Sequence, residues 1–513
     1  MSSKISRREL LAAGGTGAVA LSLGGVFPGR ARALAPGAYP FVAGVASGEP
    51  AADSIVLWTR LALDSLGRLP IGGKVPVAWE LAEDEQLTRI VGRGTQTATA
   101  ADGHSVHVEV DGLEPAREYW YRFYANGEAS AVGRTRTAPA PGASPDRLRF
   151  CLASCSNWEA GWFTGYRRIA EDDPWFVIHV GDYIYEGGPG TTGVRTHSNA
   201  EPMDLDGYRE RHSQYNSDPD LLELRRLFPI IVTPDDHEVE NNYANLISQV
   251  DTEPDQDPKV FAKRRAAAYR AYYEFMPLRD AQHPKGSGMQ LYRELPLGDL
   301  AHVVVADTRQ YRTDQPYGDK GPADGPEMTD PAATLPGIAQ EQWIVDRMSA
   351  SKSTWTILAQ QVLMARHDLV PGAATGYSTD QWDAYRASRQ RVLRGIHDGG
   401  TRNPVVLTGD IHQHYASDLL ADFDDPSSPI VGSELCGTSI SSGGDGNDGT
   451  DPQLAENPWI KFNASRRGYV RVTMDATELR ADFRTLAAVT TPSAPASTRA
   501  SFTLHDGVRG LQG

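Results

Sequence analysis

The chain has 513 residues and a formal net charge of −16, so its surface is acidic overall. This acidity argues against a nucleic-acid partner, because phosphate backbones are bound through basic surfaces. Hydrophobic residues make up 40% of the chain and charged residues 23%, which places it among ordinary globular proteins. An acidic protein that acts on anionic substrates needs local positive charge, and bound metal ions are one source of it.

Residues 1–33 are typical of an export signal. Arg7 and Arg8 precede an apolar stretch rich in Gly and Ala, and small residues follow at Ala31 and Ala33. The segment SRRELL resembles the twin-arginine signal, which directs the export of folded proteins. The alternative is a membrane anchor, but the apolar stretch is barely long enough to span a bilayer. We therefore expect a secreted or cell-envelope protein that has no transmembrane anchor once the signal is cleaved.

The cysteine content is low for an exported protein that relies on disulfides. The three cysteines are Cys151, Cys155 and Cys436. Four residues of extended strand separate two Cα atoms by about 13 Å, which is too far for a disulfide between the first two cysteines. At least one thiol is therefore expected to be free, and it needs another role.

Residues 35–137 contain short alternating strands separated by turn residues, which indicates an all-β sandwich domain. Within it, LEPAREYWYRFYA is similar to a strand of fibronectin-like modules. Residues 138–147 are rich in Pro, Ala and Gly and read as a linker. From residue 148 to 513, apolar runs alternate with helical, charged segments, which predicts an α/β domain with sheets covered on both faces.

Polar side chains follow several of these apolar runs at the point where each run ends. In open α/β sheets the active crevice lies at the carboxyl ends of strands, and chance would scatter such residues along the chain. The coincidence therefore predicts a metal centre. The runs are RFCLASCSN with Cys155, WFVIHVGDYIY with Asp182 and Tyr185, PIIVTPDDHE with Asp235, Asp236 and His237, STWTILAQQ with Gln360 and Gln361, and NPVVLTGDIHQH with Asp410 and His412.

These motifs resemble those of the calcineurin-like metallophosphatases, whose ligands follow strands as D-x-H, G-D, G-N-H-E/D, H and G-H-x-H. Here Cys155 replaces the first Asp, GDYIY adds Tyr185, DDHE replaces G-N-H-E, a Gln replaces the lone His, and GDIH replaces G-H-x-H. That combination is similar to the PhoD-type alkaline phosphatase/phosphodiesterase family, which includes phospholipase D-like members. The resemblance covers nearly the whole chain, and it implies a metallophosphatase-type sheet sandwich flanked by helices after a fibronectin-like domain.

The donor set predicts two kinds of metal. Cys155, Tyr185, His412 and Asp182 combine thiolate, phenolate, imidazole and carboxylate groups, and such anionic donors stabilise Fe³⁺. At the second position Asp236 replaces Asn, a Gln replaces one His and Asp410 replaces another His. Oxygen donors in place of nitrogen donors favour Ca²⁺. The family resemblance implies the same answer, an iron ion beside one or two calcium ions, with Asp182 as the natural bridge.

Asp182 and His237 are the predicted catalytic residues. The resemblance implies that His237 contacts phosphate or protonates the leaving group, and Glu238 is expected to orient the ring. Asp235 is expected to support the ligands rather than bind metal.

The remaining polar residues leave alternatives open. Asn241 and Asn242 either donate oxygens to calcium or shape a loop, and His414 either supports a ligand or is exposed to solvent. Four arginines are expected to form surface ion pairs more readily than to clamp phosphate. They are Arg167, Arg168, Arg309 and Arg312.

The predicted function is metal-dependent hydrolysis of a phosphate monoester or diester, in which two metals activate water for in-line attack on phosphorus. One alternative is a phospholipase D that acts on phospholipid head groups. An alternative of another class is a non-catalytic, calcium-dependent surface-binding protein, against which the intact set of ligand-type residues argues. The loops at 186–217 and 313–337 are expected to set how open the cleft is, and thus the preference for monoester or diester.

Overall fold

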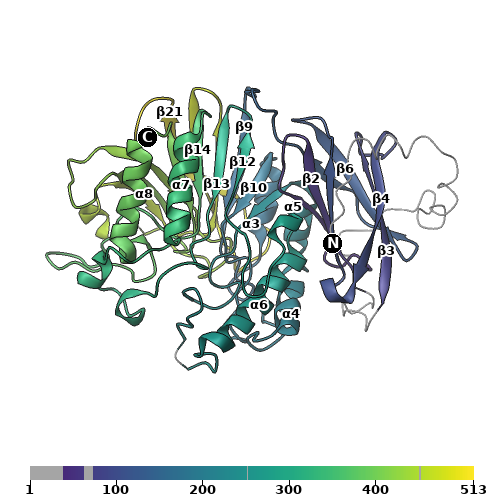
Figure 1. Ribbon diagram of the computed structural model, residues 1–513, viewed down its shortest axis with the longest axis horizontal. Helices are drawn as coiled ribbons and strands as arrows, with labels where there is room; N and C mark the ends of the chain where they lie inside the picture. Colours follow the sequence, from purple (N-terminus) through teal and green to yellow (C-terminus); the bar gives the residue numbers. More distant parts are fainter. Residues whose placement is uncertain (1–38, 63–72, 251, 450–451, 513) are drawn as a thin grey trace.

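The computed structural model describes residues 39–62, 73–250, 252–449 and 452–512. The predicted export signal, residues 1–33, lies outside these described residues. The described residues form an α/β fold with three sheets and with helices on two sides (Figure 1). No helix among the described residues is long and apolar enough to cross a membrane.

The first large sheet has nine strands in the order β21-β20-β19-β9-β10-β11-β1-β2-β5. Its centre is parallel, because β9, β10 and β11 run in the same direction. The strands are β1 (Val45–Gly48), β2 (Ser54–Arg60), β5 (Ser105–Asp111), β9 (Leu148–Ala153), β10 (Phe176–His179), β11 (Ile230–Val232), β19 (Gly468–Met474), β20 (Glu478–Leu486) and β21 (Ala496–His505).

The second large sheet has seven strands in the order β12-β13-β14-β15-β17-β16-β18. Its four central strands β13, β14, β15 and β17 are parallel. The strands are β12 (Arg293–Leu297), β13 (Ala301–Val305), β14 (Trp355–Ala359), β15 (Pro404–Thr408), β16 (His414–Leu420), β17 (Ile430–Cys436) and β18 (Ile460–Ala464).

Among the described residues, six helices cover the outer faces of these two sheets (Figure 1). They are α3 (Thr164–Glu171), α4 (Leu205–Tyr215), α5 (Pro219–Leu227), α6 (Pro258–Phe275), α7 (Ile338–Ala350) and α8 (Arg386–Asp398). Two of them begin at an Asp-Pro pair, in which Asp218 or Asp257 accepts hydrogen bonds from the first turn. Proline suits the first helical position, since its missing N–H would have no partner there.

The alternation of side chains along the strands divides the core into layers. Leu152 and Ile178 point inward between the two sheets, where they join Val303 and Ile357 in one buried cluster. On the other face of β10, Val177 packs in the cluster that α3 to α6 cover. A third cluster lies between the second sheet and helices α7 and α8. Both sheets are therefore covered on both faces, as the uniformly apolar runs predicted.

The N-terminal strands form a sandwich that shares a sheet with the rest of the molecule. The five-stranded sheet contains β3 (Lys74–Ala82), β4 (Ile90–Thr99), β6 (Glu118–Ala125), β7 (Glu128–Ala129) and β8 (Gly133–Arg136). It packs across a buried cluster, which includes Trp79 and Tyr121, onto β2 and β5. Strand β1 then continues this layer into the large sheet, because Gly48 pairs with Ile230 of β11.

Candidate metal centre

The carboxyl ends of strands from both large sheets meet at one place. Cys155 follows β9, Asp182 follows β10, Asp236 follows β11, and Asp410 and His412 follow β15. The side chains of Cys155, Asp182 and Asp236 are nearly fully buried. Those of Asp410 and His412 are partly buried. The sequence-based expectation that successive strands deliver polar residues to one edge is thus met by the geometry.

Four of these residues have a left-handed backbone, which is unusual outside glycine. The φ angles are 60° for Cys155, 54° for Asp182, 65° for Asp410 and 55° for His412. Such conformations cost energy and persist only where the surroundings hold them, so they cluster at functional sites. Gly181 makes a still tighter approach, with a φ of 111° directly against Asp235.

Three overlapping groups of side chains could each hold a metal ion, and Asp182 belongs to all three. In every group the ligand atoms lie within 4.8 Å of one another. The groups are Cys155, Asp182 and His412; Asp182, Asp236 and His237; and Asp182, Asp235, Asp236 and Asp410. A carboxylate shared in this way could contribute an oxygen to more than one ion.

The phenol of Tyr185 reaches the first of these groups. Its hydroxyl donates to Asp182 Oδ2 at 3.0 Å and lies 2.9 Å from His412 Nε2. The ring also packs on His237, with centroids 4.1 Å apart. The GDYIY motif therefore places its phenol beside the carboxylate and the imidazole of the group that also contains the Cys155 thiol.

Some carboxylate oxygens in the cluster have no hydrogen-bond partner among the described residues. They are Asp182 Oδ1, Asp235 Oδ2 and Asp236 Oδ1, and all three are buried. Buried carboxylate oxygens without partners are costly, because they lose water and gain nothing in return. This donor set fits a bound cation, since oxygen atoms supplied in excess are what hard cations require.

Burial is the largest cause of the pKa shifts of three donors, His412, Cys155 and Tyr185. Burial lowers the pKa of His412 to about 3, with a further contribution from Arg467, so the ring is neutral and able to bind metal. Burial and then the charge of Asp182 raise the pKa values of Cys155 and Tyr185 well above their usual range. Both groups must lose a proton to bind a metal, so metal binding at this site would release protons.

His237 is paired with a residue that the sequence reasoning did not single out. Its Nδ1 lies 2.7 Å from Glu186 Oε2, and the other Glu186 oxygen accepts from Asn241 N at 2.7 Å. Burial disfavours the charged ring, but Glu186, Asp236 and Asp182 outweigh it and raise the pKa of His237 well above its usual value. Glu186 directly follows Tyr185, the last residue of the GDYIY motif, and this position next to the motif was the available signal.

The expectation that Glu238 orients His237 is wrong. The Glu238 carboxylate instead accepts hydrogen bonds from backbone N–H groups of Asp182, Tyr183 and Asp235. It therefore fixes the two loops that follow β10 and β11 to each other. Adjacent residues in a tight loop point in different directions, so proximity in sequence to His237 did not indicate contact.

Arg309 lies inside the carboxylate cluster, contrary to the expectation of a surface ion pair. Its Nε donates to Asp235 at 2.5 Å, and its two terminal nitrogens donate to Asp380 at 2.7 and 2.8 Å. It also lies 3.7 Å from Asp236 and from Asp410. Every guanidinium nitrogen thus faces a carboxylate, so Arg309 supports the cluster rather than offering a free fork to phosphate.

Of the other three arginines, one is buried and two form ion pairs at the surface. Arg312 is buried and bonds to Asp380 at 2.6 Å, so it too is no surface residue. Arg167 and Arg168 do form the expected surface pairs, with Asp220 at 2.6 Å and with Glu171 at 2.7 Å.

Two glutamines and one histidine do not reach the cluster. The Gln360 oxygen accepts from Val362 N and Trp382 Nε1, and the Gln361 oxygen accepts from Thr308. Both amides are therefore engaged in holding strand ends. His414 is fully buried between Thr438 N and the Arg484 carbonyl, so solvent exposure is excluded and it contacts no ligand-type residue of the centre. A different amide, Gln381, donates to Asp410 Oδ2 at 2.5 Å.

Asn241 and Asn242 lie in the loop after His237 and contact the centre through their backbones. Asn242 N donates to Asp236 Oδ2 at 2.7 Å, and Asn242 has a left-handed backbone with a φ of 58°. The Asn242 side chain donates to Asp319 Oδ2 at 2.6 Å. Their observed role is to shape the loop and orient Asp236.

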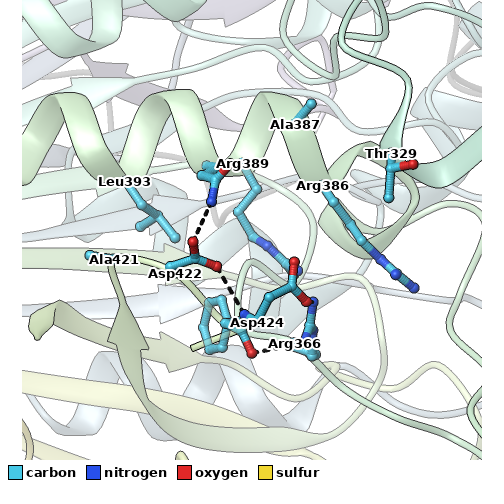
Figure 2. Close-up of a pocket in the computed structure, with 11 residues that line it drawn as sticks. Thr329, Arg366, Arg386, Ala387, Arg389, Leu393, Ala421, Asp422 and Asp424 are labelled. Atoms are coloured by element: carbon cyan, nitrogen blue, oxygen red, sulfur yellow. Dashed lines mark hydrogen bonds and ion pairs between the residues drawn. The ribbon is translucent and has the colours of Figure 1, made fainter. Parts of the chain in front are cut away.

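A separate cavity of about 140 Å³ contains none of these residues (Figure 2). Arg366, Arg386 and Arg389 line it together with Asp422 and Asp424. Each arginine already has a carboxylate partner, at 2.7 Å for Arg386 with Asp324 and 2.6 Å for Arg389 with Asp383. The cavity is therefore a balanced ionic surface and offers no comparable set of metal ligands.

Comparison with known proteins agrees with the fold. The PhoD-like phosphatase family matches residues 150–483, and the N-terminal domain of PhoD-like phosphatases matches residues 29–139. Alkaline phosphatase D of Bacillus subtilis (strain 168) is 48% identical over 484 residues, covering 92% of this chain and 82% of that protein. A solved structure of PhoD superposes with a TM-score of 0.88 at 48% identity, covering 93% of this chain and 92% of the other.

The protein is thus a phosphoric ester hydrolase by fold and by relationship. The chain belongs to the PhoD-like phosphatase family. Phosphate esters are accordingly its class of substrate, as the motifs at the strand ends had indicated.

Proposed function

We propose that this protein hydrolyses phosphate esters at a centre that contains one iron and one or two calcium ions. The observation that carries the proposal is the set of buried, unpartnered oxygens on Asp182, Asp235 and Asp236, with Asp182 common to all three donor groups. Cys155, Tyr185, His412 and Asp182 would hold Fe³⁺, and Asp182, Asp236 and Asp410 would hold calcium. Asp235, which was expected only to support the ligands, would supply an additional oxygen, and Arg309 fixes its orientation.

Bound metals at such a site activate water and neutralise phosphoryl oxygens. The chain itself contributes His237, whose side chain is partly exposed at 18% while its Nδ1 is held by Glu186. Glu186 raises the pKa of His237, which favours a protonated ring that can donate from Nε2 to a phosphate oxygen or to the leaving group. Glu186 keeps the ring in place, which was the role expected of Glu238, and it also favours the charged ring.

The experiment that tests this proposal is metal analysis of the purified protein by mass spectrometry, paired with a visible absorption spectrum. We expect about one iron per chain together with calcium, and a phenolate-to-iron absorption band that disappears in Tyr185→Phe. Tyr183→Phe, at a buried neighbour whose hydroxyl donates to Asn216 rather than to the centre, is the matched control and should keep the band. Zinc or manganese alone, in an active enzyme, would refute the assignment of iron and calcium.

The phospholipase D alternative depends on aromatic residues in NWEAGWFTGY, which sequence alone could not place. Phe163 and Tyr166 are buried, and Trp158 packs against Phe163 and Tyr215 with centroids 5.9 Å apart in both pairs. Arg195 stacks on Trp158 at 3.6 Å. These rings are therefore engaged in packing, which favours simple esters over lipid head groups as substrates. Turnover of a phosphatidylcholine vesicle at the rate of a soluble diester would reverse that preference.

We further propose that the protein is exported by the twin-arginine route and cleaved near Ala33, as Arg7 and Arg8 indicate. Domain division at 35–137, 138–147 and 148–513 remains part of the same proposal. Replacement of both arginines by lysine should leave precursor inside the producing cell, which immunoblotting of cell and medium fractions would detect.

A further inference from the structure

A carboxylate at the edge of the centre has no cationic partner among the described residues. Asp319 accepts hydrogen bonds from the side chains of Asn242 at 2.6 Å and Thr379 at 3.0 Å, and both donors are neutral. Its neighbour in the same loop, Asp324, is instead paired with Arg386 at 2.7 Å. No direct ion pair among the described residues therefore neutralises Asp319, and Arg309, which is already bonded to Asp235 and Asp380, acts on it only at a distance, whereas Asp324 is paired with Arg386.

Asp319 is linked to the metal-binding cluster through a short chain of contacts. Asn242 donates from its side chain to Asp319 and from its backbone N to Asp236 Oδ2. These two hydrogen bonds and the covalent bonds within Asn242 place the Asp319 and Asp236 carboxylates within about 10 Å of each other. Asp319 is only partly buried, so its charge lies where the cluster meets solvent.

Two loops bring Asp319 to this position and hold it there. Gln315, in the same loop, donates to the Asn242 carbonyl at 2.5 Å and to Asp380 at 3.0 Å. Further along, Ala323 pairs with Tyr377 in an isolated antiparallel bridge. The loop 313–337, which was expected to set how open the cleft is, is therefore held by hydrogen bonds both before and after Asp319.

We propose that Asp319 is a specificity-determining residue whose negative charge favours phosphate diesters over monoesters. This inference rests on the proposed function. At alkaline pH a monoester carries close to two negative charges, because its second pKa is near 6, and a diester carries one. A fixed carboxylate near the reaction centre repels the monoester more strongly by one unit of charge.

The test compares kcat/KM for p-nitrophenyl phosphate and bis-p-nitrophenyl phosphate at alkaline pH. In D319N the ratio of monoester to diester kcat/KM should rise about 3- to 10-fold, the effect of one unit charge at roughly 10 Å in a partly solvated site. D319E keeps the charge and should keep the wild-type ratio. D324N, which breaks an ion pair in the same loop, should change both substrates by the same factor.

A salt titration of the wild-type protein gives a second, independent readout. If Asp319 acts through its charge, the wild-type preference should shift toward the monoester as ionic strength rises, and D319N should show a smaller shift. Equal changes for both substrates in D319N, or salt dependence identical to wild type, would overturn the proposal. Loss of bound metal in D319N would also overturn it, since Asp319 would then be a ligand.

These results are separate from a failure of the proposed function. A wild-type protein that hydrolyses neither ester, or that holds no metal, would refute the metal-dependent hydrolysis itself. A wild-type enzyme that is active and metal-loaded but whose substrate ratio ignores D319N would refute only the role of Asp319.

Discussion

At the scale of single residues, the centre depends on backbone conformations that few residues adopt. Cys155, Asp182, Asp410 and His412 all have φ values between 54° and 65°. The loops resist relaxation because they bond to each other: Cys155 N donates to the Gly181 carbonyl at 3.1 Å, and Ser156 N donates to the Asp182 carbonyl at 2.8 Å. Strain of this kind costs about 1–3 kcal/mol per residue. The same backbone conformations direct the four side chains toward one another.

Gly181→Ala should destabilise the metal-binding loops, although it adds only a methyl group. A Cβ atom there would lie 2.4 Å from Asp235 Cβ and 2.7 Å from Asp235 N, and the φ of 111° disfavours any L-residue. We expect a loss of about 1–3 kcal/mol in the free energy of unfolding, and reduced metal content by mass spectrometry. Gly187→Ala, with no atom within 4 Å, is the control and should be neutral.

His237→Gln should lower kcat about 10²- to 10⁴-fold, the usual contribution of a proton donor. Glu186→Gln should lower kcat about 10-fold, because it leaves the imidazole in place but unsupported. Since Glu186 raises the pKa of His237, its loss should also move the alkaline limb of the kcat/KM profile to lower pH. Glu159→Gln, which breaks contacts to Gly190 and His197 instead, is the control, and an unmoved limb in Glu186→Gln would contradict the pairing.

At the scale of secondary-structure elements, the N-terminal sandwich is joined to the catalytic sheet rather than tethered to it. Strand β1 pairs with both β2 and β11. Side chains reinforce the joint: Trp58 donates to the Glu274 carbonyl at 3.1 Å, and Arg293 pairs with Glu49 at 2.6 Å. Because β11 leads directly to Asp235 and Asp236, the sandwich supports the strand that positions two carboxylates.

Gly48→Ala should test the importance of this joint. A Cβ atom at Gly48 would lie 2.4 Å from the Pro277 carbonyl oxygen and 2.8 Å from the Ile230 carbonyl oxygen, and backbone cannot move aside cheaply. Overpacking of this kind costs about 1–3 kcal/mol, measurable by urea unfolding. Gly288→Ala, whose nearest neighbour would be 3.4 Å away, should cost little. An unchanged unfolding midpoint for Gly48→Ala would show that β1 and β11 separate without cost.

At the scale of the whole molecule, several histidines are buried in the neutral form. Burial lowers the pKa of His107 and His414 to about 4, and that of His179 and His212 to about 3. An unfolded histidine titrates near 6.5, so each of these groups binds a proton only in the unfolded state between these values. Their contribution to stability is therefore complete above pH 6.5 and is lost as the pH falls toward 3 to 4.

His212 offers a direct measure of this effect. Its ring stacks on Phe275 with centroids 5.2 Å apart, and neither ring nitrogen has a partner among the described residues. In His212→Phe the slope of unfolding free energy against pH should decrease by about 1.4 kcal/mol per pH unit between pH 6 and 4. Exposed His397→Gln is the control. A slope equal to wild type would mean that His212 is already charged in the folded protein.

The sequence by itself determined the fold class, the covered sheets and which strand ends bring polar residues together, because strand periodicity and strand-end motifs are local in sequence. It missed the pairing of His237 with Glu186 instead of Glu238, the burial of Arg309, and the engagement of Gln360 and Gln361 away from the centre. Those features depend on which way side chains point in tight loops and on contacts between distant segments, such as Arg309 with Asp235 and Asp380. Only the tertiary structure decided these contacts, since they form between side chains on loops of two different sheets that are distant in sequence.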